Sequence, residues 1–239
     1  MVDFYKERYE AHYEKFGIEG SGGGDSKSIG LCELGILSKA GLKNFHSLLD
    51  FGCGIGRLTP FASDFLTTGS YLGSDISETA IDIAKKSLTQ KNVKFILNDS
   101  LSVSSISSLK SNFDFISCFS VFTHLELEDF YNLLGEFHKI THNQSKLVCS
   151  FLDLQSEYGS IIFKDESKIE YENRYLRSRN IVQSLSSIQA VAKMASWKLS
   201  EIYKEGTNFS DSLPESNYKK FGSMDLRMPQ WVGVFTKIS

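Results

Sequence analysis

The feature that most constrains the fold is a short apolar stretch that ends in an acidic residue and three glycines at alternate positions. Residues 48–58 have the sequence Leu-Leu-Asp-Phe-Gly-Cys-Gly-Ile-Gly-Arg-Leu. Because Gly52, Gly54 and Gly56 lack a Cβ, the backbone can adopt positive φ angles and a ligand can approach the main chain closely. The stretch therefore predicts a strand, a ligand-binding loop and a following helix.

The spacing of these glycines argues against a dinucleotide ligand. A dinucleotide-binding loop has the pattern G-x-G-x-x-G, in which the last glycine permits close packing of the helix on the strand. Here Arg57 occupies the position of that last glycine. The carboxylate of Asp50, just before the glycines, suits a ligand with a positively charged amino-acid group better than a diphosphate. The loop favours an adenosine cofactor that carries an amino acid.

Three further apolar segments end in residues that complete a recognisable series. The segments and the residues at their ends are 70–73 with Asp75, Ile76 and Ser77, 93–97 with Asp99 and Ser100, and 113–118 with Phe119. In this order, together with the glycine loop, they resemble the class I S-adenosylmethionine-dependent methyltransferases over roughly residues 46–125. The resemblance implies that the cofactor is S-adenosylmethionine and the product S-adenosylhomocysteine.

The resemblance also assigns cofactor-binding residues. Asp75 stands where the family holds the ribose hydroxyls, since a carboxylate can accept hydrogen bonds from both of them, and Asp99 stands where the family contacts the adenine amino group. The complete implied set is Asp50, Gly52, Cys53, Gly54, Gly56, Asp75, Ile76, Asp99, Ser100 and Phe119. The alternative for Asp75 is an acidic residue ahead of a helix that Ser77 caps, and the alternative for Asp99 is a turn.

Alternating apolar and helical segments predict an α/β fold. Strands are expected near residues 46–51, 70–73, 93–97, 113–118, 146–152, 197–204 and 231–237, and helices near 57–65, 77–88, 126–141 and 178–195. The resemblance implies a Rossmann-like, mostly parallel sheet of seven strands, with an antiparallel last strand and helices on both faces.

Residues 1–239 are expected to form a single methyltransferase domain, since α/β sheets of this size form one unit and 41% apolar residues can supply a core. Three segments lie outside the expected sheet: residues 1–45, predicted to form an N-terminal helical cap, and the inserts 153–177 and 205–230 on the substrate side. Inserts that follow the carboxyl ends of strands are expected to wall an acceptor pocket. The alternative is that their aromatic residues form the core of the inserts themselves.

Charge and cysteine content limit the partners and the chemistry that we expect. The formal net charge of −3 gives no electrostatic footprint for a polyanion and argues against a nucleic-acid partner. The four cysteines form no C-x-x-C pair, so neither a metal site nor redox chemistry is expected. The sequence has neither a signal peptide nor an apolar run long enough to cross a bilayer. We therefore expect a cytoplasmic protein without membrane insertion, whose oligomeric state the sequence leaves open.

The implied reaction transfers a methyl group from a sulfonium to an acceptor. The enzyme must align the acceptor, exclude water and, for a hydroxyl, remove its proton. His124, after the fourth expected strand, is the first candidate base because imidazole takes up a proton near neutral pH. Asp153, at the end of the fifth, is the second candidate. The alternatives are that His124 caps the next helix and that Asp153 forms a turn.

The acceptor is expected to be a small molecule or a glycan. Residues 120–125 and the terminal segment 231–237 are similar to small methyltransferases encoded with sugar and cell-envelope polysaccharide enzymes, which implies O-methylation of a sugar. Two alternatives remain: a methyltransferase for natural products or other small metabolites, and a non-catalytic scaffold protein that binds S-adenosylmethionine. The intact acidic residues and glycines of the cofactor site argue against the scaffold.

Overall fold

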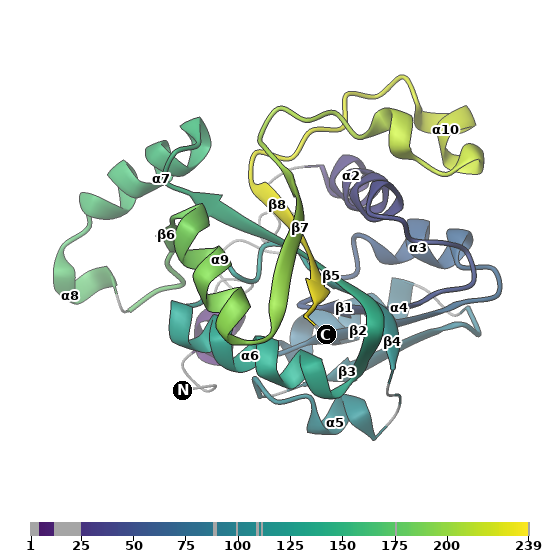
Figure 1. Cartoon of the computed structure of the whole chain (residues 1–239), viewed down its shortest axis with the longest axis horizontal. Coiled ribbons are helices and arrows are strands. Elements are labelled where there is room, and N and C mark those ends of the chain that lie inside the picture. The colour runs from purple at the N-terminus through teal and green to yellow at the C-terminus, as the bar shows by residue number, and fades with distance from the viewer. Residues whose placement is uncertain are drawn as a thin grey trace.

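The computed structural model describes residues 5–11, 25–87, 90–98, 100–108, 110, 112–174 and 176–238. Within these residues, one sheet of eight strands forms the centre of the molecule, in the order β3-β2-β1-β4-β5-β8-β7, with β6 paired to β5 beside this path (Figure 1). The strands are β1 (Ser47–Phe51), β2 (Ser70–Asp75), β3 (Val93–Leu97), β4 (Phe113–Cys118), β5 (Thr141–Asp153), β6 (Val182–Gln183), β7 (Trp197–Tyr203) and β8 (Trp231–Lys237).

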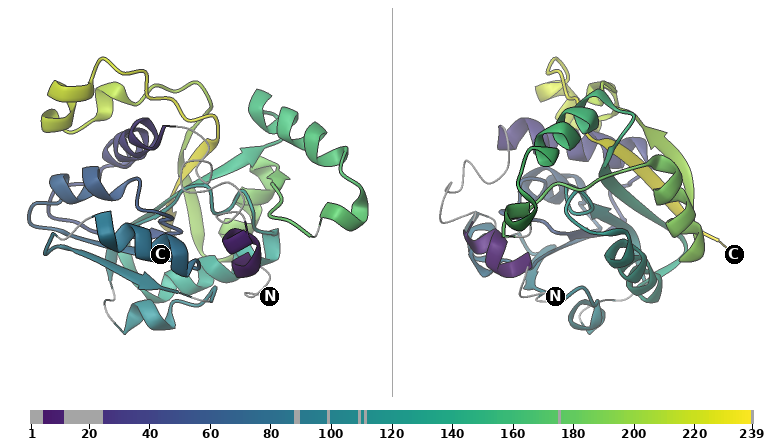
Figure 2. Two further views of the ribbon diagram at one scale, coloured as in Figure 1. Left: turned by 180° about the vertical axis from the view of Figure 1, so that it is seen from behind. Right: turned by 90° about the vertical axis from the view of Figure 1, so that its left-hand side faces the viewer.

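Helices cover both faces of this sheet. They are α2 (Ser26–Lys39), α3 (Thr59–Phe65), α4 (Glu78–Ser87), α5 (Ser104–Ser107), α6 (Leu127–Lys139), α7 (Glu157–Ser167), α8 (Tyr171–Arg174), α9 (Leu185–Met194), α10 (Glu215–Phe221) and the 3-10 helix η1 (Ser210–Ser212). Residues 5–11 are also helical. This segment, dark purple in Figure 2, lies at the opposite end of the molecule from α10.

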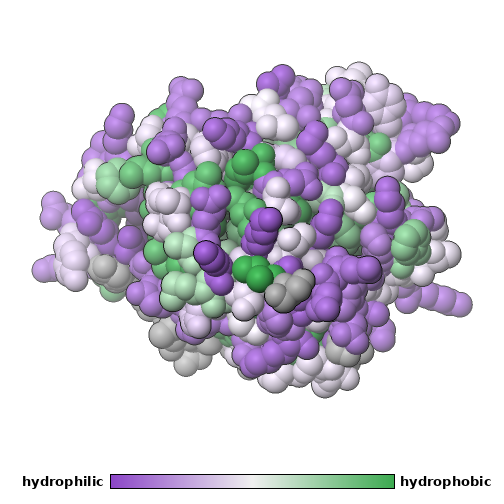
Figure 3. Space-filling view, in the orientation of Figure 1, coloured by the Kyte–Doolittle hydropathy of each residue, from purple (hydrophilic) through white to green (hydrophobic). Residues whose placement is uncertain are grey.

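Two hydrophobic cores lie between the helices and the sheet. Buried side chains of α5, α6 and α9 pack on one face, and those of α2 and α3 pack on the other. On the face shown in Figure 3, hydrophilic residues dominate the surface and hydrophobic residues gather toward its middle. Helix α6 buries one apolar face on the sheet, as its periodicity predicts, whereas residues 30–37 of α2 are buried on all sides.

The strand directions confirm the predicted fold. Strands β1 to β5 pair in parallel, whereas β8 lies antiparallel between β5 and β7. All seven predicted strands are present, with the short β6 in addition. Since parallel strands end at the same edge, the loops after β1, β2 and β4 meet at one edge of the sheet.

The predicted helix near residues 178–195 is wrong in its first part. Helix α9 begins only at Leu185, where the Ser184 side chain accepts a hydrogen bond from the Ser187 backbone N–H. The preceding residues 178–181 are not helical, and Val182–Gln183 pair with the end of β5. Ile181 N–H donates to the Thr123 carbonyl at 2.7 Å. These contacts with distant residues hold the segment in its non-helical conformation, and they cannot be deduced from its own periodicity.

The two expected inserts differ in position. Residues 157–174 form helices α7 and α8, which project from the body of the molecule (Figure 1). The insert 205–230 instead packs on the outside of α2 and α3: the Phe221 ring lies 6.4 Å from that of Phe61, and Phe209 lies against Gly35. Only its last residue, Gln230, reaches the loop after β4, where it bonds with Ser120. The organisation as a single domain stays a prediction.

Candidate active site

The glycine-rich loop joins β1 to α3 at the carboxyl edge of the sheet. Its three glycines all have positive φ angles: +77° at Gly52, +54° at Gly54 and +83° at Gly56. The N–H groups of Gly52 and Cys53 donate to the Ser74 carbonyl at 2.7 and 3.0 Å, which fastens the loop to the end of β2. Residues with a Cβ rarely adopt such angles, so the loop shape depends on these glycines.

Asp75, the last residue of β2, fixes the other side of this loop. One carboxylate oxygen accepts the Gly54 N–H at 2.7 Å and the other accepts the Ser77 N–H at 2.9 Å. Burial raises the pKa of Asp75, although the hydrogen bonds from Ser77 and Gly54 act in the opposite direction. Since a carboxylate oxygen can accept more than one hydrogen bond, both oxygens can also accept ligand hydroxyls. The loop and Asp75 therefore fit a cofactor that carries a ribose.

Asp50 lies beneath the loop and is only 4% exposed. Its oxygens accept hydrogen bonds from the Tyr71 hydroxyl at 2.6 Å and the Ser117 hydroxyl at 2.8 Å. The Thr59 hydroxyl donates to Tyr71 in turn. Burial raises the pKa of Asp50 to about 6, against the lowering effect of these hydrogen bonds. This network joins β1, β2, β4 and α3 under the loop, and direct contact of Asp50 with the cofactor stays a prediction.

The other predicted cofactor residues differ from one another in burial and in their contacts. Cys53 and Phe119 are buried, at 7% and 5% exposed, and Ile76 is partly buried after β2. Ser100 forms a turn in which its hydroxyl accepts the Ser102 N–H. Asp99 lies outside the described residues. The structure thus brings the glycines and Asp75 together, and the roles of the remaining residues stay predictions.

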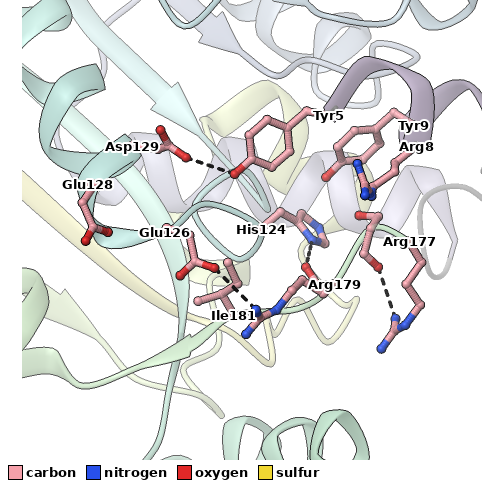
Figure 4. Close-up of a pocket in the computed structure, with 11 residues that line it drawn as sticks. Tyr5, Arg8, Tyr9, His124, Glu126, Glu128, Asp129, Arg177, Arg179 and Ile181 are labelled. Carbon is pink, nitrogen blue, oxygen red and sulfur yellow. Dashed lines mark hydrogen bonds and ion pairs between the residues drawn. The ribbon is translucent and has the colours of Figure 1, made fainter. Parts of the chain in front are cut away.

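A cavity of about 500 Å³ lies beside the loop that follows β4 (Figure 4). It is walled by the helical residues 5–11, by the loop from β4 and the first turn of α6, and by the non-helical segment 177–181, through Tyr5, Arg8, Tyr9, His124, Glu126, Glu128, Asp129, Arg177, Ser178, Arg179 and Ile181. Val121 links it to the glycine loop, because a Cβ at Gly52 would lie 2.3 Å from its Cγ2. His124 N–H donates to the Val121 carbonyl at 3.0 Å.

The hydrogen bond of His124 sets its tautomer. Nδ1 lies 2.9 Å from the Arg179 carbonyl oxygen. Because a carbonyl can only accept, Nδ1 carries a proton, and in the neutral ring Nε2 is then the atom that takes up a further one. The Tyr9 ring meets the imidazole edge-on, with ring centres 5.7 Å apart. The orientation of His124 is fixed by these two contacts, in a state that suits a general base.

The polar groups around the cavity form internal pairs. The Tyr5 hydroxyl donates to Asp129 at 3.0 Å, and burial together with Asp129 raises the pKa of Tyr5. Arg179 lies 3.5 Å from Glu126, as Figure 4 shows. These pairs hold together walls that come from distant parts of the chain, and the surface that faces the cavity is mainly apolar.

Asp153, the second predicted base, is not among the residues that line this cavity. It is 1% exposed. Its oxygens accept the Gln155 N–H at 2.8 Å and the Leu185 N–H at 2.6 Å. These bonds close the turn after β5 and cap the start of α9, which favours the turn-forming alternative for Asp153.

The expected N-terminal cap, the end of the insert 153–177 and His124 all contribute to the cavity wall, whereas the part formed by the start of α6 and by residues 178–181 was not predicted. Arg179 was expected inside a helix, and Asp129 belongs to a helix whose acidic first turn is also explained by the helix dipole. The sequence Arg-Ser-Arg at 177–179, which lacks apolar periodicity, was the available signal. Among the described residues, no helix is both long enough and apolar enough to cross a membrane. The exclusion of nucleic acid and the cytoplasmic location stay predictions.

Comparison with known proteins supports the assignment of the cofactor side. Residues 48–144, from β1 into β5, match the model of a family described as a methyltransferase domain. This match, which covers less than half of the chain, supports the prediction of a methyltransferase domain that uses S-adenosylmethionine.

Curated relatives match only short segments. One segment of 82 residues is 34% identical to an uncharacterised protein of Rickettsia prowazekii and covers 34% of this chain and 32% of that protein. Another, of 62 residues, is 47% identical to the ribosomal protein L11 methyltransferase of Neisseria meningitidis and covers 25% of this chain and 21% of that protein. The chain thus spans about a third or less of the length of these relatives.

The fold as a whole is similar to solved methyltransferase structures. The magnesium protoporphyrin IX methyltransferase of Synechocystis PCC 6803, crystallised with S-adenosylhomocysteine, superposes with a TM-score of 0.61 at 14% identity, over 99% of this chain and 97% of that one. At this identity the similarity shows a shared fold and not a shared acceptor.

Proposed function

We propose that this chain is an S-adenosylmethionine-dependent methyltransferase that methylates a hydroxyl group of a small molecule or glycan, with a sugar as the acceptor. The match of residues 48–144 to a methyltransferase domain supports the class of reaction. His124 carries the proposal, because it lines the cavity and its Nδ1 is committed to the Arg179 carbonyl. Val121, three residues before His124, lies against Gly52 of the glycine loop.

The bound cofactor supplies a methyl group activated by the positive charge of a sulfonium. The glycine loop and Asp75 hold the cofactor at the edge of the sheet, and the cavity holds the acceptor beside it. As the oxygen of the acceptor hydroxyl attacks the methyl group, Nε2 of His124 accepts the proton of that hydroxyl. The Arg179 carbonyl then stabilises the positively charged imidazolium, because Nδ1 still donates to it.

The cavity lining is compatible with an acceptor that has apolar faces as well as hydroxyls. Tyr5 and Tyr9 contribute aromatic rings, whereas Glu126, Glu128 and Arg8 contribute groups that accept and donate hydrogen bonds. A volume of about 500 Å³ is in the range of small-molecule sites. An acceptor with both apolar faces and several hydroxyls, such as a sugar, matches this lining.

The test is transfer of label from methyl-labelled S-adenosylmethionine into an extract of the source cells, separated into small-molecule and glycan fractions. Label in a sugar or glycan supports the whole proposal, and label in another small metabolite supports the reaction and contradicts the sugar. If no fraction is labelled although S-adenosylhomocysteine binds tightly, the result favours a non-catalytic binder or an acceptor that is missing from the extract, and it contradicts a sugar or glycan acceptor present in these cells.

The matched control is His124→Gln, which keeps a polar side chain but cannot act as a base. Its binding of S-adenosylhomocysteine should equal that of the wild type while labelling falls. Equal labelling by both proteins would contradict the assignment of the base.

A further inference from the structure

Helix α2 carries a buried carboxylate that faces the glycine loop. Glu33 is 4% exposed, and its Oε1 lies 3.8 Å from Nη2 of Arg57, the residue that follows the last glycine. A buried carboxylate destabilises a fold unless it is paired, so its presence requires an explanation. The methyl-transfer mechanism above makes no use of it.

The same face of α2 is pressed against the backbone of Arg57. Gly30 lies three residues before Glu33, and so on the same side of the helix. A Cβ at Gly30 would lie 2.2 Å from the carbonyl oxygen of Arg57. Helix α2 therefore contacts both the main chain and the side chain of Arg57. Movement of the end of the cofactor loop would disrupt these contacts.

The charges around Glu33 are mostly negative. Arg57 and Asp50 face it from the loop and from β1, the Cys32 thiol lies next to it on α2, and Asp75 faces Asp50 from β2. Two carboxylates, those of Glu33 and Asp50, thus share one guanidinium group, and Asp75 adds a third negative charge beside Asp50. Burial raises the pKa of Glu33 to about 7 and that of Asp50 to about 6. These groups exchange protons within the physiological pH range.

We propose that Glu33 is a positioning residue of the cofactor site, which holds Arg57 at the end of the glycine loop and, when ionised, favours a positively charged cofactor over a neutral one. The inference rests on the proposed function, because it concerns S-adenosylmethionine. This cofactor carries a sulfonium charge that S-adenosylhomocysteine lacks. An extra negative charge near the loop therefore strengthens the binding of S-adenosylmethionine relative to that of S-adenosylhomocysteine. This difference in affinity helps the protein to replace the product by fresh cofactor.

Binding of the cationic cofactor should release protons from this cluster. A positive charge beside carboxylates favours their ionised form and lowers their pKa. By linkage, the affinity for S-adenosylmethionine rises with pH through the range in which Glu33 ionises, by about tenfold for each pKa unit that binding displaces. The affinity for S-adenosylhomocysteine should rise less.

The test is isothermal titration calorimetry of the full chain with S-adenosylmethionine and with S-adenosylhomocysteine at pH 5.5, 7 and 8. Each titration is run in two buffers that differ in ionisation enthalpy, so that proton release is measured directly. In the wild type, we expect proton release with S-adenosylmethionine and an affinity ratio of the two ligands that grows about tenfold from pH 5.5 to pH 8. A ratio that does not change with pH overturns the inference without any variant.

The variant Glu33→Gln separates the contribution of Glu33 to the pH dependence from those of Asp50 and Asp75. It should bind both ligands with a ratio that changes much less with pH, and its proton release should fall. The matched control is Asp211→Asn, which removes an exposed negative charge from η1 and should behave as the wild type. Full pH dependence in Glu33→Gln overturns the inference, whereas failure of the wild type to bind either ligand at any pH refutes the proposed function itself.

Discussion

Replacement of Glu33 by glutamine should make the folded protein more stable at pH 8 and change its stability little at pH 5. Burial raises the pKa of Glu33 from its ordinary value of 4.5 to about 7. Because each pKa unit corresponds to about 1.4 kcal/mol, keeping Glu33 ionised in the folded state costs about 3 kcal/mol at high pH. The attraction of Arg57 is already contained in this pKa.

The sign follows from the two states of the chain. Below pH 4.5 Glu33 is protonated in both the folded and the unfolded protein, so ionisation has no effect on stability. Between pH 4.5 and 7 only the unfolded chain ionises, and the wild type loses stability as the pH rises. Above pH 7 the loss is complete. Glutamine, which resembles the protonated carboxyl in shape, does not suffer this loss.

Urea denaturation followed by circular dichroism at pH 5 and pH 8 measures both quantities. The free energy of unfolding of Glu33→Gln should exceed that of the wild type by up to about 3 kcal/mol at pH 8 and by less than about 1 kcal/mol at pH 5. A variant no more stable than the wild type at pH 8 would refute the argument that the buried carboxylate is ionised there at a cost. A gain in stability together with a loss of cofactor discrimination would show that the carboxylate is kept for function.

Four further substitutions test other parts of the structure. Gly30→Ala should lower the free energy of unfolding by about 2 kcal/mol or more, since its Cβ would lie 2.2 Å from the Arg57 carbonyl oxygen. Gly135→Ala, with nothing within 4 Å of the added Cβ, should raise it by about 0.5 to 1 kcal/mol. Thermal melts of both variants test this difference, and equal effects would contradict the close packing of Gly30 on Arg57. Asp75→Ala should weaken S-adenosylhomocysteine binding by about 1 to 3 kcal/mol in calorimetry, because hydrogen bonds to a charged acceptor are lost; unchanged affinity would remove Asp75 from the site. His124→Gln should slow methyl transfer to the acceptor by about 100-fold or more, and a full rate across pH would exclude it as the base.

The parts of the fold that were predicted correctly are those that local sequence determines. The glycine loop follows from glycines that supply positive φ angles at three alternate positions. The buried strand β1 follows from its clustered apolar residues Leu48, Leu49 and Phe51. The antiparallel placement of β8 came from the family resemblance, because periodicity carries no information about strand direction.

The parts that were missed depend on contacts between distant residues. The non-helical segment before α9 is held by the hydrogen bond of Ile181 to Thr123 and by that of His124 to Arg179. Neither bond can be read from the local sequence pattern, so the part of the cavity wall that residues 178–181 form could not be deduced. Similarly, Glu33 lies in an apolar helical run where one acidic residue is unremarkable in sequence, and only the structure shows that it faces Arg57.

The most direct test of the central claim is equilibrium binding of S-adenosylhomocysteine and of NAD to the same protein preparation by calorimetry. The account predicts one site per chain for S-adenosylhomocysteine, weakened in Asp75→Ala, and no comparable binding of NAD. Preferential binding of NAD, or the absence of any S-adenosylhomocysteine binding, would contradict it.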